Sequence, residues 1–548
     1  MDHKVVPFDG IGLCFSGGGY RATFFDLGVI SYLHKIQYKG KPLLDSVVAL
    51  STVSGGTLTG VAFGKAAQDS SFKFDEFYRS FYDTFTPEND KLLPTAVAKL
   101  ENDDVWKKHP YKKRSLINAF ALTYSEMEPF KGSFEVFKGP TDSALKNVCF
   151  NATDFSFGLV FRFQNGRGVF GNSPLKASEL NQVKYDIQLG DIVASSSCFP
   201  MGFEPLVFPD DYYSDHSNED YKALKLLPKF AKGVGIMDGG IADNQGIDSM
   251  MKISERSSVK DHFNLIMVND VSSYKMQPWL QDESKIKDKT SLQNTFKNIL
   301  SYFKIKPLYW VVLLVGLILF IANGFGLITG ASNPWITGIG AFLTGVGLVL
   351  CILGWILNKE SQKVLHWVQT AFKDNVPEAL IGDIISFERL QIGLLKRMIT
   401  DRATSTFKMV YDIFLKQIRR LNYEILYEDP SLEHKLITST VYELNGQKSV
   451  YKNTSISKEV KEPPSKALQQ AALIASETPT TLWWDKTDIK VKRMDNLIAC
   501  GQFTTCYNLI KYVAELEGDD ITSDDLKKLR KDLDADWAAF NKDPLQFV

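Results

Sequence analysis

Two turns near the start of the chain contain residues whose types and spacing suit acyl transfer. Ser54 follows the apolar run at 46–50 and precedes two glycines, which is the pattern of a nucleophile elbow, a sharp turn that lifts a serine hydroxyl above a sheet. Three consecutive glycines at 17–19 follow another apolar run at 11–15, and glycine N–H groups can approach and point at an anion. We therefore expect the first turn to supply an oxyanion hole and the second to supply a nucleophile.

Asp238 is the best placed base for Ser54. None of the seven histidines lies in a glycine-rich turn after a strand or has the surroundings of a catalytic triad. Asp238 follows the apolar run 233–237 and precedes two glycines, so we expect both side chains to project from the carboxyl ends of parallel strands. A serine–aspartate dyad needs no third member when the carboxylate is partly desolvated and lies within hydrogen-bond reach.

Each turn taken singly has another interpretation. The triple glycine also suits a phosphate-binding turn, although the lysine and the serine or threonine of a P-loop are absent. A dinucleotide-binding fingerprint needs a third glycine where Ala22 stands, and Asp-Gly-Gly alone is an ordinary turn. The three turns in this order along the chain are far more specific than any one of them.

In these residues the chain resembles the patatin-like phospholipases. The family pattern is a Gly-Gly-Gly-x-Arg/Lys oxyanion loop, a Gly-x-Ser-x-Gly elbow and an Asp-Gly-Gly/Ala turn, and the resemblance extends from Val5 to Val271. It implies a three-layer α/β/α fold with a mostly parallel central sheet, and lipid acyl ester cleavage without metal or cofactor by nucleophile Ser54 and base Asp238. The other residues that match are Gly17, Gly18 and Gly19 for the oxyanion hole and Arg21, Gly56, Gly239 and Gly240 in supporting positions.

One residue departs from the family pattern. Thr52 stands where the elbow has its first glycine, so the turn must accommodate a Cβ beside the neighbouring strand. The glycines that follow Ser54 are intact, and the departure therefore concerns the detail of the elbow rather than the nucleophile.

The composition is that of a folded protein and not of a disordered one. With 548 residues, 44% hydrophobic and 23% charged, the chain has room for two or three domains or one large core with additions. A net charge of -1 gives no general attraction to nucleic acid. The six cysteines are scattered and the start lacks a secretory apolar run, so we expect the catalytic part to stay in the reducing cytosol.

Two long uncharged segments interrupt this pattern. Residues 307–328 and 334–357 contain no charged side chain, and each would be about 33–36 Å long as a helix, against a hydrocarbon core of about 30 Å. The five residues between them are polar and turn-forming. We therefore expect a transmembrane helical hairpin, inserted between the catalytic part and the rest of the chain.

Charges and small residues indicate how this hairpin is placed. Two lysines precede it, two follow it and its turn has none, so the positive-inside rule puts both termini and the catalytic domain in the cytoplasm. Small residues four apart allow close helix contact, which serves either the hairpin itself or the pairing of two protomers. These pairs are Ala341 with Gly345 and Gly326 with Gly330.

The remaining patterns complete the expected organisation. We expect strands at 147–155, 158–163 and 262–269, and within 191–200 a small-residue helix that is halted by the proline and whose serines serve packing. We also expect an amphipathic helix at 387–426, a β-hairpin around 445–446, and helices at 465–476 and 519–540. The expected parts are a catalytic domain over 1–276, a polar basic linker over 277–306, the hairpin over 307–357, and a helix-rich cytoplasmic region over 358–548 that packs on the catalytic domain.

The expected function is cleavage of fatty-acyl ester bonds in phospholipids or lysophospholipids of the cytoplasmic leaflet. An enzyme whose ester substrate lies in a bilayer gains effective concentration by being tethered to that bilayer. Two alternatives stay open, a neutral-lipid or general esterase and a non-enzymatic membrane scaffold whose α/β domain only binds lipid or a partner.

Overall fold

The computed structural model describes most of the chain. The described residues are 6–139, 142–166, 168–200, 202–256, 263–272, 279–280, 307–328, 330, 333–352, 355, 392–447 and 458–548. The chain divides into two compact units, one formed by residues 1–277 with 410–548 and the other by residues 278–409. Almost all of the linker expected at 277–306 lies outside the described residues, as do the four lysines that flank the hairpin.

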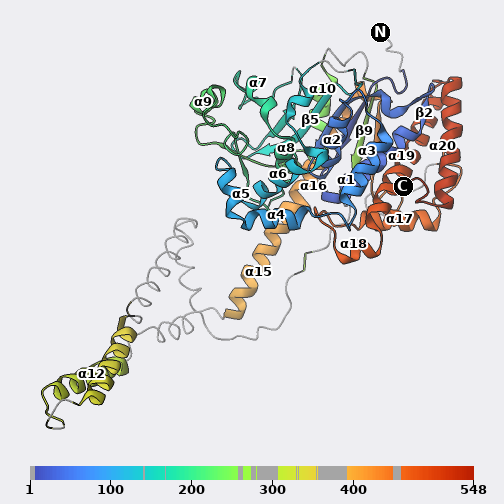
Figure 1. Ribbon diagram of the computed structural model, residues 1–548. Helices are drawn as coiled ribbons and strands as arrows, with labels where there is room; N and C mark the ends of the chain where they lie inside the picture. The colour runs from blue at the N-terminus through green and yellow to red at the C-terminus, as the bar shows by residue number, and fades with distance from the viewer. Residues whose placement is uncertain are drawn as a thin grey trace, which may run out of the picture. The chain divides into compact units, whose positions relative to one another are not determined.

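The first unit is built on an eight-stranded, mostly parallel sheet (Figure 1). In sheet order the strands are β10 (Leu436–Thr440), β9 (Leu265–Asp270), β1 (Ile11–Phe15), β4 (Val47–Val53), β5 (Asn147–Asp154), β8 (Val234–Asp238) and β7 (Leu206–Phe208), with β6 (Val160–Gln164) also paired to β5. The first five run parallel, β6 and β8 are antiparallel to β5, and β7 is antiparallel to β8. The central parallel strands β9, β1 and β4 are mostly apolar because both of their faces are covered.

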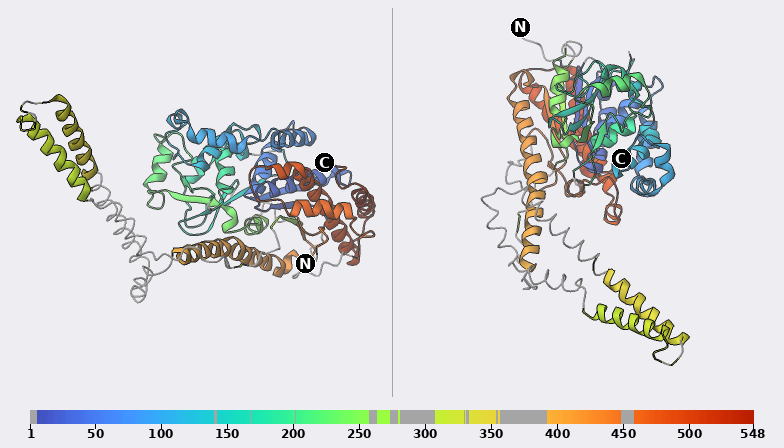
Figure 2. Two further views of the ribbon diagram at one scale, coloured as in Figure 1. Left: turned by 90° about the horizontal axis from the view of Figure 1, so that it is seen from below. Right: turned by 90° about the vertical axis from the view of Figure 1, so that its left-hand side faces the viewer.

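Helices cover both faces of this sheet, which gives the three-layer α/β/α fold (Figures 1 and 2). The helices α1 (Gly19–Lys35), α2 (Gly55–Ala66) and α19 (Arg493–Gly518) share one core with the sheet, and α10 (Ile247–Ser254) and α16 (Leu415–Glu428) share another. Successive residues of β1 point to opposite sides, since Leu13 and Phe15 lie in the first core and Cys14 in the second.

The direction of β8 differs from our prediction that Ser54 and Asp238 both follow parallel strands. β4 pairs with β5 as far as Val53, which lies opposite Asn151. Because β6 occupies the other edge of β5, β8 continues on the edge that β4 leaves, and its last residue Asp238 lies opposite Ala152. The carboxyl ends of β4 and β8 therefore meet head to head along β5.

The C-terminal part of the chain completes the first unit. The long helix α19, to which the sequence patterns assigned no element, packs along α1, and the two are drawn side by side in red and blue (Figures 1 and 2). Glycines allow this close packing, because a Cβ added to Gly28 would lie 2.0 Å from the Ile498 carbonyl oxygen and one added to Gly501 would lie 2.0 Å from the Phe25 carbonyl oxygen.

The β-hairpin expected around residues 445–446 is wrong in its first strand. The strand of this region is β10 at 436–440, which pairs with β9, and residues 441–444 form a turn. The expected second strand, beyond residue 447, lies outside the described residues. The strand lies earlier in the chain because it pairs with β9, and it ends at Thr440, opposite Asp270.

The second unit contains a pair of apolar helices, α12 (Pro307–Gly324) and the helix Pro334–Ile352. By length and composition both are long and apolar enough to cross a membrane. Asn323 joins their ends, because its side-chain amide donates to the Asn333 carbonyl oxygen and to Thr337 Oγ1, at 2.8 Å in each case.

The glycines at the contact of these two helices are not the expected ones. A Cβ added to Gly316, Gly340 or Gly347 would come within 2.4–2.7 Å of the backbone of the facing helix. Nothing lies within 4 Å of such a Cβ at Gly345 or Gly330. Gly340 and Gly347 are seven residues apart, which returns to the same helix face after two turns.

Candidate active site

Ser54 occupies the turn between β4 and α2. Its backbone has φ 50° and ψ −122°, a left-handed conformation that is unusual for a side-chain-bearing residue and typical of a nucleophile elbow. The Ser54 N–H donates to Ser196 Oγ at 2.8 Å, and the Thr57 N–H donates to the Ser54 carbonyl oxygen at 2.8 Å. These two bonds hold the strained turn in place, and Ser54 is 8% exposed.

Ser196, at the end of α8 (Leu189–Ser196), ties the elbow to the sheet. Its hydroxyl donates to the Asn151 carbonyl oxygen of β5 at 2.6 Å and lies 2.8 Å from Thr57 Oγ1. We expected the serines of this helix to serve only packing. Ser196 also orients the backbone of Ser54. The sequence contains no signal for this contact, because 142 residues separate the two.

Asp238 reaches the Ser54 hydroxyl from the end of β8. Ser54 Oγ donates to Asp238 Oδ2 at 2.7 Å, while Asp238 Oδ1 accepts the Gly240 N–H at 2.7 Å. Burial raises the pKa of Asp238 from 3.8 to about 6, although the bonds from Ser54 and Gly240 act in the opposite direction. One carboxylate oxygen is thus fixed by the backbone, and the other is placed to accept the serine proton.

The glycine loop lies next to the elbow. A Cβ added to Gly55 would lie 2.6 Å from the Gly19 nitrogen, and one added to Gly17 would lie 3.1 Å from Ser54 Cβ. Gly18 and Gly19 have φ values of 154° and 55°, and in the described part of the chain their N–H groups have no acceptor. The Gly17 N–H instead donates to the Asn244 carbonyl oxygen at 2.9 Å, so it is already occupied.

The Cβ of Thr52 is accommodated by a glycine in the following helix. A Cβ added to Gly60 would lie only 2.4 Å from Thr52 Cγ2, so the threonine methyl fills the space that a larger residue at position 60 would need. Thr52 Oγ1 lies 2.9 Å from Thr57 Oγ1 and so joins the hydroxyl network of the elbow. The departure from the Gly-x-Ser-x-Gly pattern therefore has a structural compensation at Gly60.

The supporting glycines lie where a side chain would not fit, Gly56 and Gly239 against backbone segments and Gly240 against side chains. An added Cβ would lie 2.7 Å from the Ser16 carbonyl oxygen at Gly56 and 2.4 Å from the Asn151 carbonyl oxygen at Gly239. A Cβ added to Gly240 would lie 2.6 Å from Asn244 Oδ1. A side chain at any of these positions would push the elbow, the glycine loop and the Asp238 turn apart.

Arg21 holds the C-terminal region by hydrogen bonds. It is buried, and its Nη1 donates to the carbonyl oxygens of Ser476 and Thr478 at 3.3 and 3.1 Å. Burial lowers the pKa of Arg21 to about 10. The adjacent Tyr20 N–H donates to the Thr481 carbonyl oxygen at 2.8 Å, so the segment after α17 (Lys466–Ser476) lies against the start of α1.

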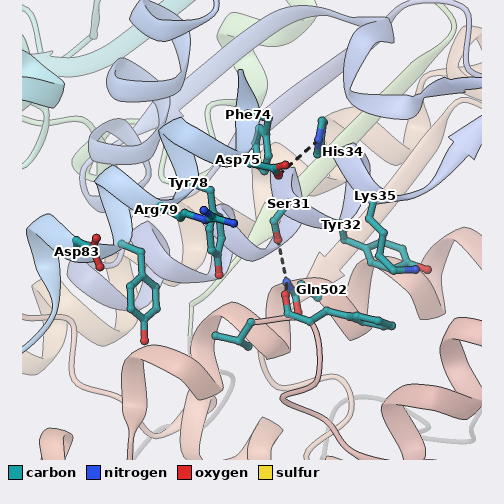
Figure 3. Close-up of a pocket in the computed structure, with 13 residues that line it drawn as sticks. Ser31, Tyr32, His34, Lys35, Phe74, Asp75, Tyr78, Arg79, Asp83 and Gln502 are labelled. Atoms are coloured by element: carbon teal, nitrogen blue, oxygen red, sulfur yellow. Dashed lines mark hydrogen bonds and ion pairs between the residues drawn. The ribbon is translucent and has the colours of Figure 1, made fainter. Parts of the chain in front are cut away.

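Three cavities lie away from this site. A cavity of about 590 Å³ is lined by residues of α1, α3 (Phe74–Phe85) and α19, including Tyr78 and Gln502, which Figure 3 labels. Two smaller cavities of about 350 and 290 Å³ lie among residues 109–221 and 168–181. Neither Ser54 nor Asp238 lines any of these three cavities, and the two residues are 8% and 6% exposed.

The sequence comparison decides the family of this domain. Residues 13–251 match the model of the patatin-like phospholipase family. The chain carries a patatin-like phospholipase domain. This domain marks the protein as a lipid acyl hydrolase. A search of curated proteins finds no match.

The patatin-like domain does not contain the whole sheet. The family match ends at residue 251, yet β9 and β10 lie beyond it and extend the same sheet next to β1. Of the residues expected at the site, the structure brings together Ser54, Asp238 and the glycine loop. In the described part of the chain, the hydrogen-bond partners of the Ser54 and Asp238 side chains include no histidine.

Proposed function

We propose that this protein hydrolyses fatty-acyl ester bonds of phospholipids or lysophospholipids through a dyad of Ser54 and Asp238. The observation that carries the proposal is the 2.7 Å hydrogen bond from Ser54 Oγ to Asp238 Oδ2, made from an elbow turn inside a patatin-like domain. A hydroxyl bonded to a carboxylate whose pKa is about 6 can transfer its proton as it attacks near neutral pH.

In the acylation step, Ser54 Oγ attacks the ester carbonyl carbon and its proton moves to Asp238 Oδ2. The carbonyl oxygen becomes an oxyanion, and we assign its stabilisation to the N–H groups of Gly18 and Gly19. Collapse of this intermediate breaks the ester bond, and the leaving alkoxide of the lipid takes the proton from Asp238. The acyl group is then bound to Ser54 as an ester.

In the deacylation step, a water molecule donates its proton to Asp238 and attacks the acyl-enzyme carbonyl carbon. The oxyanion forms at the same glycine N–H groups. When the intermediate collapses, Ser54 Oγ leaves and recovers the proton from Asp238. The fatty acid departs, and the dyad returns to its starting state.

We further propose that the apolar helix pair anchors the enzyme in a bilayer, with both chain ends on the cytoplasmic side. The support is the length and composition of α12 and of the helix Pro334–Ile352, together with the lysines that flank them in the sequence. Deletion of 307–357 should then move the protein into the soluble fraction. Continued tight membrane association of the deletion variant would assign the anchoring to another surface.

A serine-directed fluorophosphonate and mass spectrometry of lipid products test the proposed reaction. The wild type and Ser71→Ala, which alters an exposed serine on a loop, should be labelled and should release fatty acid from phospholipid vesicles. Ser54→Ala should do neither. Release from triacylglycerol but not from phospholipid would favour a neutral-lipid esterase, and absence of labelling in the wild type would favour a lipid-binding scaffold.

A further inference from the structure

A buried carboxylate at the end of β9 is held by two side chains of α16. Asp270 is fully buried, and its Oδ2 accepts Arg419 Nε at 2.5 Å and the Tyr423 hydroxyl at 2.9 Å. Burial alone would raise the pKa of Asp270, but the Arg419 guanidinium and the other donors lower it below the ordinary value. Asp270 is therefore a charged group whose position depends on α16.

The same face of α16 holds the loop that follows Asp238. Asn422 Nδ2 donates to Asp243 Oδ1 at 2.9 Å, and Asp243 is 1% exposed. The Asp243 carboxylate also accepts the Gly246 N–H at 3.0 Å, so it fixes the shape of the loop from within. Gln245 Nε2 of this loop lies 3.3 Å from Asp270 Oδ2, which links the two buried carboxylates.

Asn244 connects this loop to the glycine loop of the active site. Its carbonyl oxygen accepts the Gly17 N–H at 2.9 Å, and its side-chain amide donates to Ser272 Oγ at 2.9 Å. The Ser272 N–H in turn donates to Asp270 Oδ1 at 2.8 Å. A continuous series of hydrogen bonds therefore runs from Arg419 through Asp270 and Asn244 to the glycine loop.

We propose that Arg419 is a positioning residue for acyl transfer, which acts through Asp270, Ser272 and Asn244 on the oxyanion loop. Arg419 contacts neither Ser54 nor the glycine N–H groups, and the proposal rests on the dyad mechanism given above. Loss of the guanidinium leaves Asp270 as a buried carboxylate without its counter-ion. The end of β9 then relaxes, Asn244 moves with it, and the Gly18 and Gly19 N–H groups lose their alignment with the oxyanion.

A purely structural role for the ion pair predicts a different result. If Arg419 only holds α16 on the sheet, its loss lowers the melting temperature but leaves each folded molecule with normal turnover. If it positions the oxyanion loop, kcat falls in the folded molecules while KM is kept, because the interaction lost is made in the transition state.

The test compares Arg419→Gln with Arg420→Gln, which removes the adjacent exposed arginine of the same helix. The full chain is assayed on phospholipid vesicles, with active molecules counted by fluorophosphonate labelling. We expect Arg419→Gln to lower kcat per labelled site about tenfold at unchanged KM. We also expect faster hydrogen exchange of the Gly17 amide, which donates to the Asn244 carbonyl oxygen, in Arg419→Gln, and neither change in Arg420→Gln.

Tyr423→Phe keeps the ring and removes only one donor to Asp270, so it provides a milder second variant if Arg419→Gln does not fold. We expect it to lower kcat about two- to threefold. Wild-type kcat per labelled site in Arg419→Gln or, where that variant is not obtained, in Tyr423→Phe overturns the proposal. Ser54→Ala is assayed in parallel, because hydrolysis that persists in that variant would reject the dyad itself rather than the positioning role.

Discussion

Ser54 Oγ and Asp238 Oδ2 lie 2.7 Å apart because the strands that precede them end against each other. β4 stops opposite Asn151 of β5, and Asp238 takes the next position on that edge, opposite Ala152. Asp238 thus occupies the position along β5 that the next residue of β4 would otherwise take. Two rigid strand ends, rather than a long loop, fix the distance between the hydroxyl and the carboxylate.

Asp238→Asn tests the base. An amide cannot accept the serine proton, so we expect kcat/KM for ester cleavage to fall by about two to four orders of magnitude while the protein still folds. Asp75→Asn, which alters a carboxylate on α3 whose side chain is 80% exposed, serves as the control and should keep full activity. Normal turnover in Asp238→Asn would remove Asp238 from the mechanism.

The pH dependence of turnover should report the pKa of Asp238. The carboxylate must be ionised to act as a base, and its pKa is about 6, so kcat/KM should fall tenfold for each pH unit below about 6. An uncharged ester substrate keeps substrate ionisation out of the profile. An acid limb near pH 4, where an ordinary aspartate titrates, would show that the base is not desolvated.

The raised pKa of Asp238 also predicts how the stability of the protein depends on pH. The folded state holds the Asp238 proton more tightly than the unfolded state, so stability falls as the pH rises from about 4 to about 6. Above pH 6 the ionised Asp238 destabilises the folded state by about 3 kcal/mol, which corresponds to the difference between the pKa values of 3.8 and about 6. Asp238→Asn should therefore raise the melting temperature at pH 8 relative to the wild type. At pH 4 the two proteins should melt at similar temperatures.

Gly60 should be intolerant of substitution because of Thr52. A Cβ at position 60 would lie 2.4 Å from Thr52 Cγ2, so Gly60→Ala should cost about 1–3 kcal/mol of stability and slow turnover. Thr52→Ser removes that methyl group and keeps the hydroxyl that contacts Thr57. The double variant Thr52→Ser/Gly60→Ala should recover most of the loss in denaturant unfolding, and additive losses would contradict the pairing.

Gly19→Ala tests the oxyanion loop. Gly19 has φ 55° and an added Cβ would lie 2.3 Å from the Thr480 carbonyl oxygen, so the loop must shift. We expect kcat to fall by about two to three orders of magnitude, as when an oxyanion donor is lost. Gly40→Ala is the matched control, because Gly40 also has a positive φ but its Cβ would meet nothing within 4 Å. Equal losses in both variants would point to backbone strain alone.

The sequence alone determined which residues could do the chemistry. Ser54, Asp238 and the glycines each stand in a short continuous motif, and the constraint there is local, since a strand followed at once by a turn needs glycine at particular positions. The α/β class and the two apolar helices were also predictable, because they depend on hydrophobic periodicity and on length. Local patterns of this kind can be recognised in the sequence without knowing which distant residues they contact.

Only the tertiary structure decided how these motifs meet. The antiparallel direction of β8, the role of Ser196 and the pairing of Thr52 with Gly60 depend on contacts across the sheet or between a strand end and a helix. The burial of α19 against α1 and the reach of Arg419 to Asp270 join residues that are far apart in the chain. Such contacts leave no periodic trace in a single sequence, because the energy of packing belongs to pairs of residues rather than to either one.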